Sequence, residues 1–152
     1  MRALAILAVL AGALGCGSKS YSQSVPGYPG GCPSFGYEEV IGLINKERSA
    51  RGINAIGINT PLMCSARLLS ANLFQSKRCS HTDTLGQSPW QRAQICGGNA
   101  NGEIIACGQR TAREAVDAWL RSPGHARIML DPAMTSAGSW REGNYYVVVF
   151  KR

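Results

Sequence analysis

The spacing of apolar residues predicts two amphipathic helices in the first part of the folded region. The first helix has one face that carries Tyr37, Val40, Ile41, Ile44 and Arg48, with acidic and other charged residues elsewhere around it. Such a stripe is typical of a helix that packs on a core, and Gly52 provides its stop. A second helix is expected to begin at Thr60-Pro61 and to end near Lys77-Arg78. Its buried stripe consists of Leu62, Ala66, Leu69 and Leu73.

Two further helices are expected later in the chain. Thr111 and Glu114 form a capping box at the start of the third helix. The apolar face of this helix consists of Ala115, Val116 and Trp119. Ser122-Pro123 ends it and caps a short fourth helix, which runs through Leu130.

The last part of the chain changes to β character. Residues 145–150 form a nearly continuous run of β-branched and aromatic side chains, which predicts an interior strand. Gly143-Asn144 is a turn signal, so residues 135–140 are the expected partner strand. Residues 103–106 are a candidate third strand. Because helices come mostly first and strands late, the pattern favours an α+β layered domain over repeated βαβ units.

The N-terminus has the features of an export signal. Met1-Arg2 precedes an apolar run over residues 3–14, which is too short for a mature membrane span but suits a signal peptide over residues 1–15. Small residues before Cys16 resemble a bacterial lipobox, with Ala13 where leucine is usual, so Cys16 is a candidate for lipidation. The alternative is plain secretion after cleavage nearby. Either way, the protein is expected to leave the cytoplasm.

Composition supports one exported domain after a linker. Residues 16–36 are rich in glycine, serine and proline and are expected to act as a tether, which leaves residues 37–152 for the domain. A hydrophobic content of 45% is enough for a core, and 16% charged residues exclude a disordered polyelectrolyte. The net charge of +7 comes from scattered cations without a basic tract, so a nucleic-acid partner is not expected.

Six cysteines in an exported chain indicate disulfide bonds. If Cys16 is lipidated, five remain, and one of them is left free or bonded to another molecule. Cys64 and Cys79 lie at opposite ends of the second helix, roughly 20 Å apart, so they cannot bond to each other. Cys32 with Cys64 and Cys96 with Cys107 are two conceivable pairs.

Few side chains are suited to catalysis. The chain has two histidines, His81 and His125, and Glu103 lies between glycine-rich and apolar segments, where a buried acid needs a partner. The sequence has no zinc-ligand spacing, no nucleophile elbow and no phosphate-binding loop. Spacing alone therefore does not define a site.

Several blocks in order resemble the CAP/SCP superfamily (cysteine-rich secretory, antigen 5 and pathogenesis-related proteins) in its short bacterial form. The resemblance spans residues 37–150, and its most specific block contains Trp119 and Ser122-Pro123-Gly124-His125. The other blocks are residues 44–48, 61–62 with the second helix, 80–83, 88–92 and 102–106.

The resemblance implies a three-layer α-β-α sandwich with a small antiparallel sheet. It also implies a cleft with two histidines and two acids, in which His81, His125 and Glu103 match three of the four. The second acid has no counterpart, because Ser122 stands at its usual place. Ile104 and Ala126 are further departures, replacing an asparagine and an arginine of the family pattern.

The resemblance favours a non-enzymatic binding module, secreted or lipid-anchored to the bacterial envelope, whose cleft contains His81, Glu103, His125 and Ser122. Its expected partners are an anionic envelope polymer, a lipid or a small hydrophobic ligand, with membrane contact only through the N-terminal lipid. No cofactor is certain, although His81, His125 and Glu103 could hold Zn²⁺ or another divalent cation. A metal-assisted hydrolase using the same cleft is the alternative.

Overall fold

The computed structural model describes residues 37–152, so the expected signal peptide, Cys16 and the tether lie outside the described residues. The helices are α1 (Tyr37–Ser49), α2 (Thr60–Ser76), α3 (Pro89–Ile95), α4 (Ala112–Arg121) and α5 (Pro123–Met129). The strands are β1 (Gly57–Ile58), β2 (Gly102–Cys107), β3 (Ser136–Glu142) and β4 (Tyr145–Lys151). Within residues 37–152, no helix is both long and apolar enough to cross a membrane.

The four strands form one sheet in the order β1-β3-β4-β2. β3 and β4 form an antiparallel hairpin around Gly143, and β2 pairs antiparallel with the other side of β4. β1 pairs parallel with β3, so the sheet is mixed, whereas the sequence predicted only its antiparallel part. The two residues of β1 are too few to show the alternation of apolar and polar side chains by which a strand is predicted.

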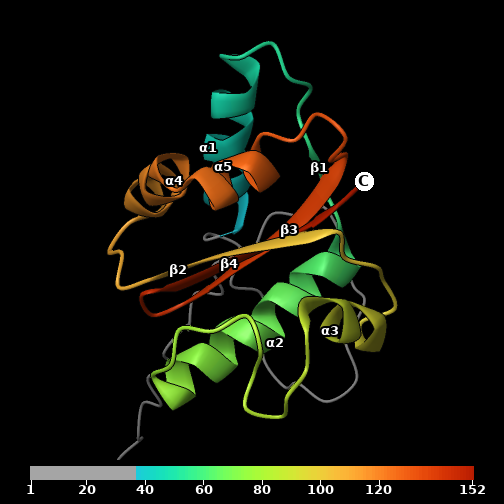
Figure 1. The fold of residues 1–152 in the computed structure, drawn as a ribbon, viewed down its shortest axis with the longest axis vertical. Coiled ribbons are helices and arrows are strands. Elements are labelled where there is room, and N and C mark those ends of the chain that lie inside the picture. The colour runs from blue at the N-terminus through green and yellow to red at the C-terminus, as the bar shows by residue number, and fades with distance from the viewer. Residues whose placement is uncertain (1–36) are drawn as a thin grey trace, which may run out of the picture. The chain divides into compact units, whose positions relative to one another are not determined.

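Helices cover both faces of the sheet, which confirms the α+β sandwich (Figure 1). α1, α4 and α5 lie on one face, and α2 and α3 lie on the other. Successive side chains of the interior strand β4 point alternately toward the two helical layers, as they do in any β-strand. Tyr146, Val148 and Phe150 pack in the core under α1 and α4, whereas Val147 and Val149 pack against α2.

Helix starts follow local capping signals, including two that the sequence analysis missed or misplaced. The N-cap of α2 is Asn59 rather than Thr60, because the Asn59 side chain accepts a hydrogen bond from the Leu62 amide. α3 was not predicted, although Ser88 and Gln91 form a capping box with a proline between them. The Thr111 cap of α4 is confirmed by its hydrogen bond from the Glu114 amide.

Arg48 of α1 is fully buried and ties the helix to the loops beside it. Its guanidinium donates hydrogen bonds of 2.8–3.0 Å to four backbone carbonyls, which belong to Asn54, Met129, Asp131 and Met134. Buried carbonyls need such partners, because leaving them unpaired costs free energy. One side chain therefore links the end of α1 to the segment between α5 and β3.

The contact between α2 and the sheet requires a glycine at position 138. A Cβ on Gly138 of β3 would lie 2.0 Å from the Met63 nitrogen and 2.2 Å from the Leu62 carbonyl carbon. Backbone thus packs on backbone at the start of α2. Farther along, the Arg67 guanidinium lies 5.3 Å from the centre of the Trp140 ring.

We predict that Arg48→Lys lowers the free energy of unfolding by at least about 2 kcal/mol, because one ammonium cannot reach all four carbonyls. Arg51→Lys is the matched control, since the exposed Arg51 side chain pairs with Glu47 of the same turn and with no other side chain within residues 37–152. Urea unfolding measures both variants. Equal losses in the two variants would show that the buried hydrogen bonds contribute little.

Candidate functional site

The candidate site lies at β2, a strand at the edge of the sheet. Glu103 of β2 points to the same face as Ile105, toward α2 and α3. His81 comes from the loop after α2, and His125 comes from α5 in the opposite helical layer. The fold therefore brings His81, Glu103 and His125, which follow one another at intervals of 22 positions, together at the edge of β2.

The Glu103 carboxylate is buried and has a partner on each oxygen. Its side chain is 1% exposed. Oε1 lies 2.9 Å from His81 Nδ1, and Oε2 accepts a hydrogen bond of 2.8 Å from Arg92. An ionised carboxylate can only accept hydrogen bonds, so Nδ1 of His81 carries the proton in this pair. Nε2 of His81 makes no hydrogen bond within residues 37–152.

Arg92 of α3 joins this pair to the loop around it and is fully buried. Besides Glu103, it donates to the carbonyls of His81 at 2.9 Å and Gln87 at 2.5 Å. Its other carboxylate neighbour is Asp83, at 3.5 Å. Arg92 thus holds the Glu103 carboxylate and the backbone of His81, whose ring the carboxylate orients.

The sequence analysis assigned no role to Arg92. The sequence offered only its place in the block of residues 88–92, which also contains the Ser88 cap of α3. Nothing local distinguishes it from an exposed arginine, because its partners come from β2 and the preceding loop.

His125 lies beside His81, with 6.5 Å between the ring centres and 49° between the ring planes. Its helix is positioned by α4, whose buried Trp119 donates a hydrogen bond of 2.8 Å to the Ile105 carbonyl of β2. The pKa of His125 is lowered from its usual 6.5. The larger cause is partial burial of the ring, and the smaller cause is electrostatic repulsion from His81. His125 is therefore favoured in its neutral form at neutral pH.

Among residues 37–152, neither Ser122, a predicted cleft residue, nor the nearby Asp83 makes a side-chain hydrogen bond to a histidine ring. Ser122 is the residue between α4 and α5, and among the described residues its side chain makes no capping hydrogen bond. The Asp83 carboxylate accepts hydrogen bonds from the Leu85 and Gln87 amides and lies against Arg92. Asp83 therefore supports the loop through its contacts with two loop amides and with Arg92.

As arranged, the three expected metal ligands do not form a three-ligand site. The two oxygens of Glu103 are taken by His81 and by the Arg92 cation, which repels a metal ion. No group of three histidine, cysteine, aspartate or glutamate side chains within residues 37–152 has the geometry to hold a metal. In this arrangement Glu103 orients His81 and is not itself free to act as a ligand.

Disulfide bonds hold the segments that carry the site. Cys64 of α2 bonds to Cys96 at the end of α3, and Cys79 bonds to Cys107 at the end of β2. The predicted absence of a Cys64–Cys79 bond is confirmed, but the suggested Cys32–Cys64 and Cys96–Cys107 pairs are wrong. The observed pairs follow from which segments the sheet and α3 bring together, which spacing along the chain cannot reveal.

Comparison with known proteins gives one family match over most of the described chain. The model described as CAP, the cysteine-rich secretory protein family, matches residues 41–149. A curated relative, the uncharacterized protein YkwD of Bacillus subtilis (strain 168), is 33% identical over 103 residues. The match covers 66% of this chain, which spans only 40% of that relative's length.

Three of the similar solved structures illustrate the shared fold. An extracellular protein with an SCP domain from Bacillus anthracis superposes with a TM-score of 0.73 at 22% identity, covering 76% of this chain and 40% of that protein. An outer surface protein of Borrelia burgdorferi superposes with a TM-score of 0.66 at 25% identity, covering 74% of this chain and 89% of that protein. A cysteine-rich secretory protein of Staphylococcus aureus superposes with a TM-score of 0.61 at 15% identity, covering 74% of this chain and 36% of that protein.

Removal of Arg92 should be far more harmful than removal of an exposed arginine. We expect Arg92→Ala to lower the free energy of unfolding by about 3–5 kcal/mol, because Glu103 would keep a buried charge without its cation. Arg113→Ala removes ion pairs whose arginine is 42% exposed and should cost less than about 1 kcal/mol. Chemical denaturation measures both, and similar losses would contradict a buried ion pair.

The lowered pKa of His125 predicts a loss of stability in mild acid. Below pH 6.5 the unfolded chain binds a proton that the folded chain resists, so this contribution is present above 6.5 and is lost as the pH falls toward the folded pKa. His125→Gln should flatten the dependence of the unfolding free energy on pH between about pH 7 and about pH 5. Parallel profiles for the variant and the natural protein would contradict the prediction.

Proposed function

Because the chain belongs to the CAP (cysteine-rich secretory protein) family, we propose that it acts outside the cytoplasm as a non-enzymatic binding module. The His81–His125 pair is the proposed point of contact with the ligand. The observation that carries the proposal is the buried Arg92–Glu103 pair, which fixes His81 with Nε2 available beside a second, neutral imidazole.

Three observations support an extracytoplasmic location. Two of the similar structures are described as an extracellular protein and an outer surface protein. Two disulfide bonds fit an oxidising compartment. The N-terminal sequence has the apolar run of a signal peptide before Cys16, and attachment through a lipid on Cys16 is part of the proposal.

The site has the chemistry of binding through hydrogen bonds. When the ring is neutral, Nδ1–H of His81 donates to Glu103 and Nε2 is an acceptor, which suits a hydroxyl group of a polyol phosphate polymer and not its phosphate oxygens. The His81 side chain is 47% exposed, so a large ligand can reach it without opening the fold. Fixed orientation before binding reduces the entropy that a ligand must overcome.

An anionic envelope polymer is the preferred ligand among the three expected classes. The net charge of +7 raises the local concentration of polyanions near the protein. The two carboxylates at the site, Glu103 and Asp83, are both turned toward Arg92, which limits their repulsion of an approaching anion. A lipid or a small hydrophobic ligand is less well matched to a site made of polar rings and carboxylates.

The alternative of a metal-assisted hydrolase has less support. Such an enzyme needs a metal-bound water or an available base. Glu103 is the only acid in contact with either histidine among residues 37–152, and both of its oxygens are already engaged. A stoichiometric metal that is lost on chelation together with a hydrolytic activity would favour the enzyme over the binding module.

The proposal can be tested by titrating the full chain, with isotope-labelled histidine rings, with poly(glycerol phosphate). We expect the imidazole signals of His81 and His125 to shift saturably, and His81→Gln/His125→Gln to weaken binding by about tenfold or more. Arg113→Gln, at an ion pair with Glu47, is the control that removes one positive charge, and neutral dextran is the control polymer. Unchanged affinity in the double variant would falsify the proposal.

A further inference from the structure

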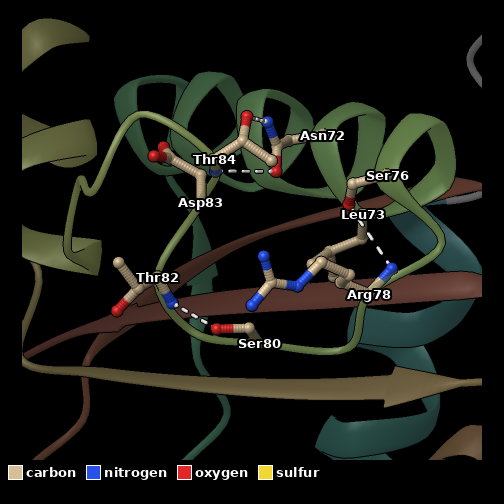
Figure 2. Close-up of a pocket in the computed structure, with 8 residues that line it drawn as sticks. All are labelled: Asn72, Leu73, Ser76, Arg78, Ser80, Thr82, Asp83 and Thr84. Atoms are coloured by element: carbon tan, nitrogen blue, oxygen red, sulfur yellow. Dashed lines mark hydrogen bonds between the residues drawn. The ribbon is translucent and has the colours of Figure 1, made fainter.

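A second recess lies beside the histidine loop and has no assigned role. It is a cavity of about 120 Å³ between the C-terminal half of α2 and residues 78–84 (Figure 2). Its lining consists of Asn72, Leu73, Ser76, Arg78, Ser80, Thr82, Asp83 and Thr84. Neither histidine ring belongs to this lining, although His81 lies between two residues that do. The cavity is thus separate from the site described above.

The walls of the cavity are fixed by hydrogen bonds between α2 and the loop. Asn72 donates to the Thr84 hydroxyl at 2.7 Å and accepts from the Thr84 amide at 3.2 Å. Residue 79, within the loop, is covalently tied to Cys107 of β2. The recess therefore keeps its shape without a ligand, as preformed binding sites do.

The cavity has several hydroxyl groups whose protons can be donated to a ligand. The Ser76 hydroxyl accepts from the Arg78 amide, the Ser80 hydroxyl accepts from the Thr82 amide, and the Thr84 hydroxyl accepts from Asn72. Each hydroxyl oxygen thus already accepts one hydrogen bond, and its own proton remains available to donate to a ligand beside a second lone pair. A lining of this kind is complementary to a ligand rich in acceptors.

The Arg78 guanidinium adds a positive charge at the centre of this lining. Figure 2 shows it reaching across the cavity between Ser80 and the Asp83–Thr84 stretch. Within residues 37–152, the guanidinium has no hydrogen bond or ion pair. The lining acid, Asp83, does not neutralise it, because its carboxylate is turned away and is held by two backbone amides and Arg92.

We propose that this cavity binds an oxyanion group, a phosphate or a carboxylate. The planar guanidinium matches either group through two parallel hydrogen bonds, and the hydroxyl protons provide further donors. The volume holds several waters but is smaller than the pockets that enclose whole organic ligands, so it suits one charged group. This inference does not depend on the proposed function, since it uses neither histidine.

A simpler role for Arg78 sets the competing expectation. A cation just beyond the end of α2 interacts favourably with the partial negative charge of the helix C-terminus. In that case Arg78 would respond to anions only through general screening, like other exposed arginines. The two roles differ in whether binding saturates and in whether it depends on the kind of anion.

The test is a backbone and arginine side-chain NMR titration of the full chain with inorganic phosphate and, separately, with acetate. Chloride at matched ionic strength is the reference. We expect saturable shifts at Arg78, Ser80 and Thr84, with phosphate alone indicating a phosphoryl site and both anions indicating a general oxyanion site. Either result supports the proposal. Shifts no different from those with chloride would overturn it.

Variants locate the binding. Arg78→Gln should weaken the phosphate affinity by about tenfold or more, whereas Arg121→Gln, exposed at the end of α4, should leave it unchanged. His81→Gln/His125→Gln should also leave it unchanged, so a failure of the histidine proposal is distinguishable from a failure here. Equal weakening by Arg78→Gln and Arg121→Gln would reduce the effect to general screening and overturn the proposal.

Discussion

The buried ion pair between Arg92 and Glu103 is the interaction on which the histidine region depends. Both side chains are removed from water, so each requires the other, and the two terminal nitrogens of Arg92 also donate to backbone carbonyls of the loop. The loop is long and has no helix or strand of its own between α2 and α3. The Arg92 guanidinium, from the helix that follows the loop, therefore restrains it together with the Asn72–Thr84 hydrogen bonds and the Cys79–Cys107 disulfide.

The position of this pair at the sheet edge explains how two helical layers meet in one site. An interior strand such as β4 is flanked by neighbours on both sides, whereas β2 has a free side around which side chains from opposite layers can approach. Glu103 faces the α2 and α3 layer, while His125 comes from the other layer. The Trp119 hydrogen bond to β2 keeps that second layer in register with the strand.

Local patterns were sufficient for most of the fold and for part of the site. The stripes of α1 and α2 and the run in β4 are repeated signals, so their elements were predicted within a few residues. The resemblance identified His81, Glu103 and His125, whose proximity the structure describes. The disulfide partners and the role of Arg92 depend on contacts between distant segments, which no local spacing encodes. α3 is a different case, because its capping signal was present and was overlooked.

The disulfide between Cys79 and Cys107 has a consequence for the order in which the molecule matures. It anchors the chain two residues before His81 to the strand that carries Glu103. In a reducing environment this anchor is absent, and only the contacts of Arg92 and neighbouring hydrogen bonds restrain the loop. Oxidation thus completes the restraint of the loop, since His81 has both its covalent anchor and its Arg92 contacts only after the Cys79–Cys107 bond has formed.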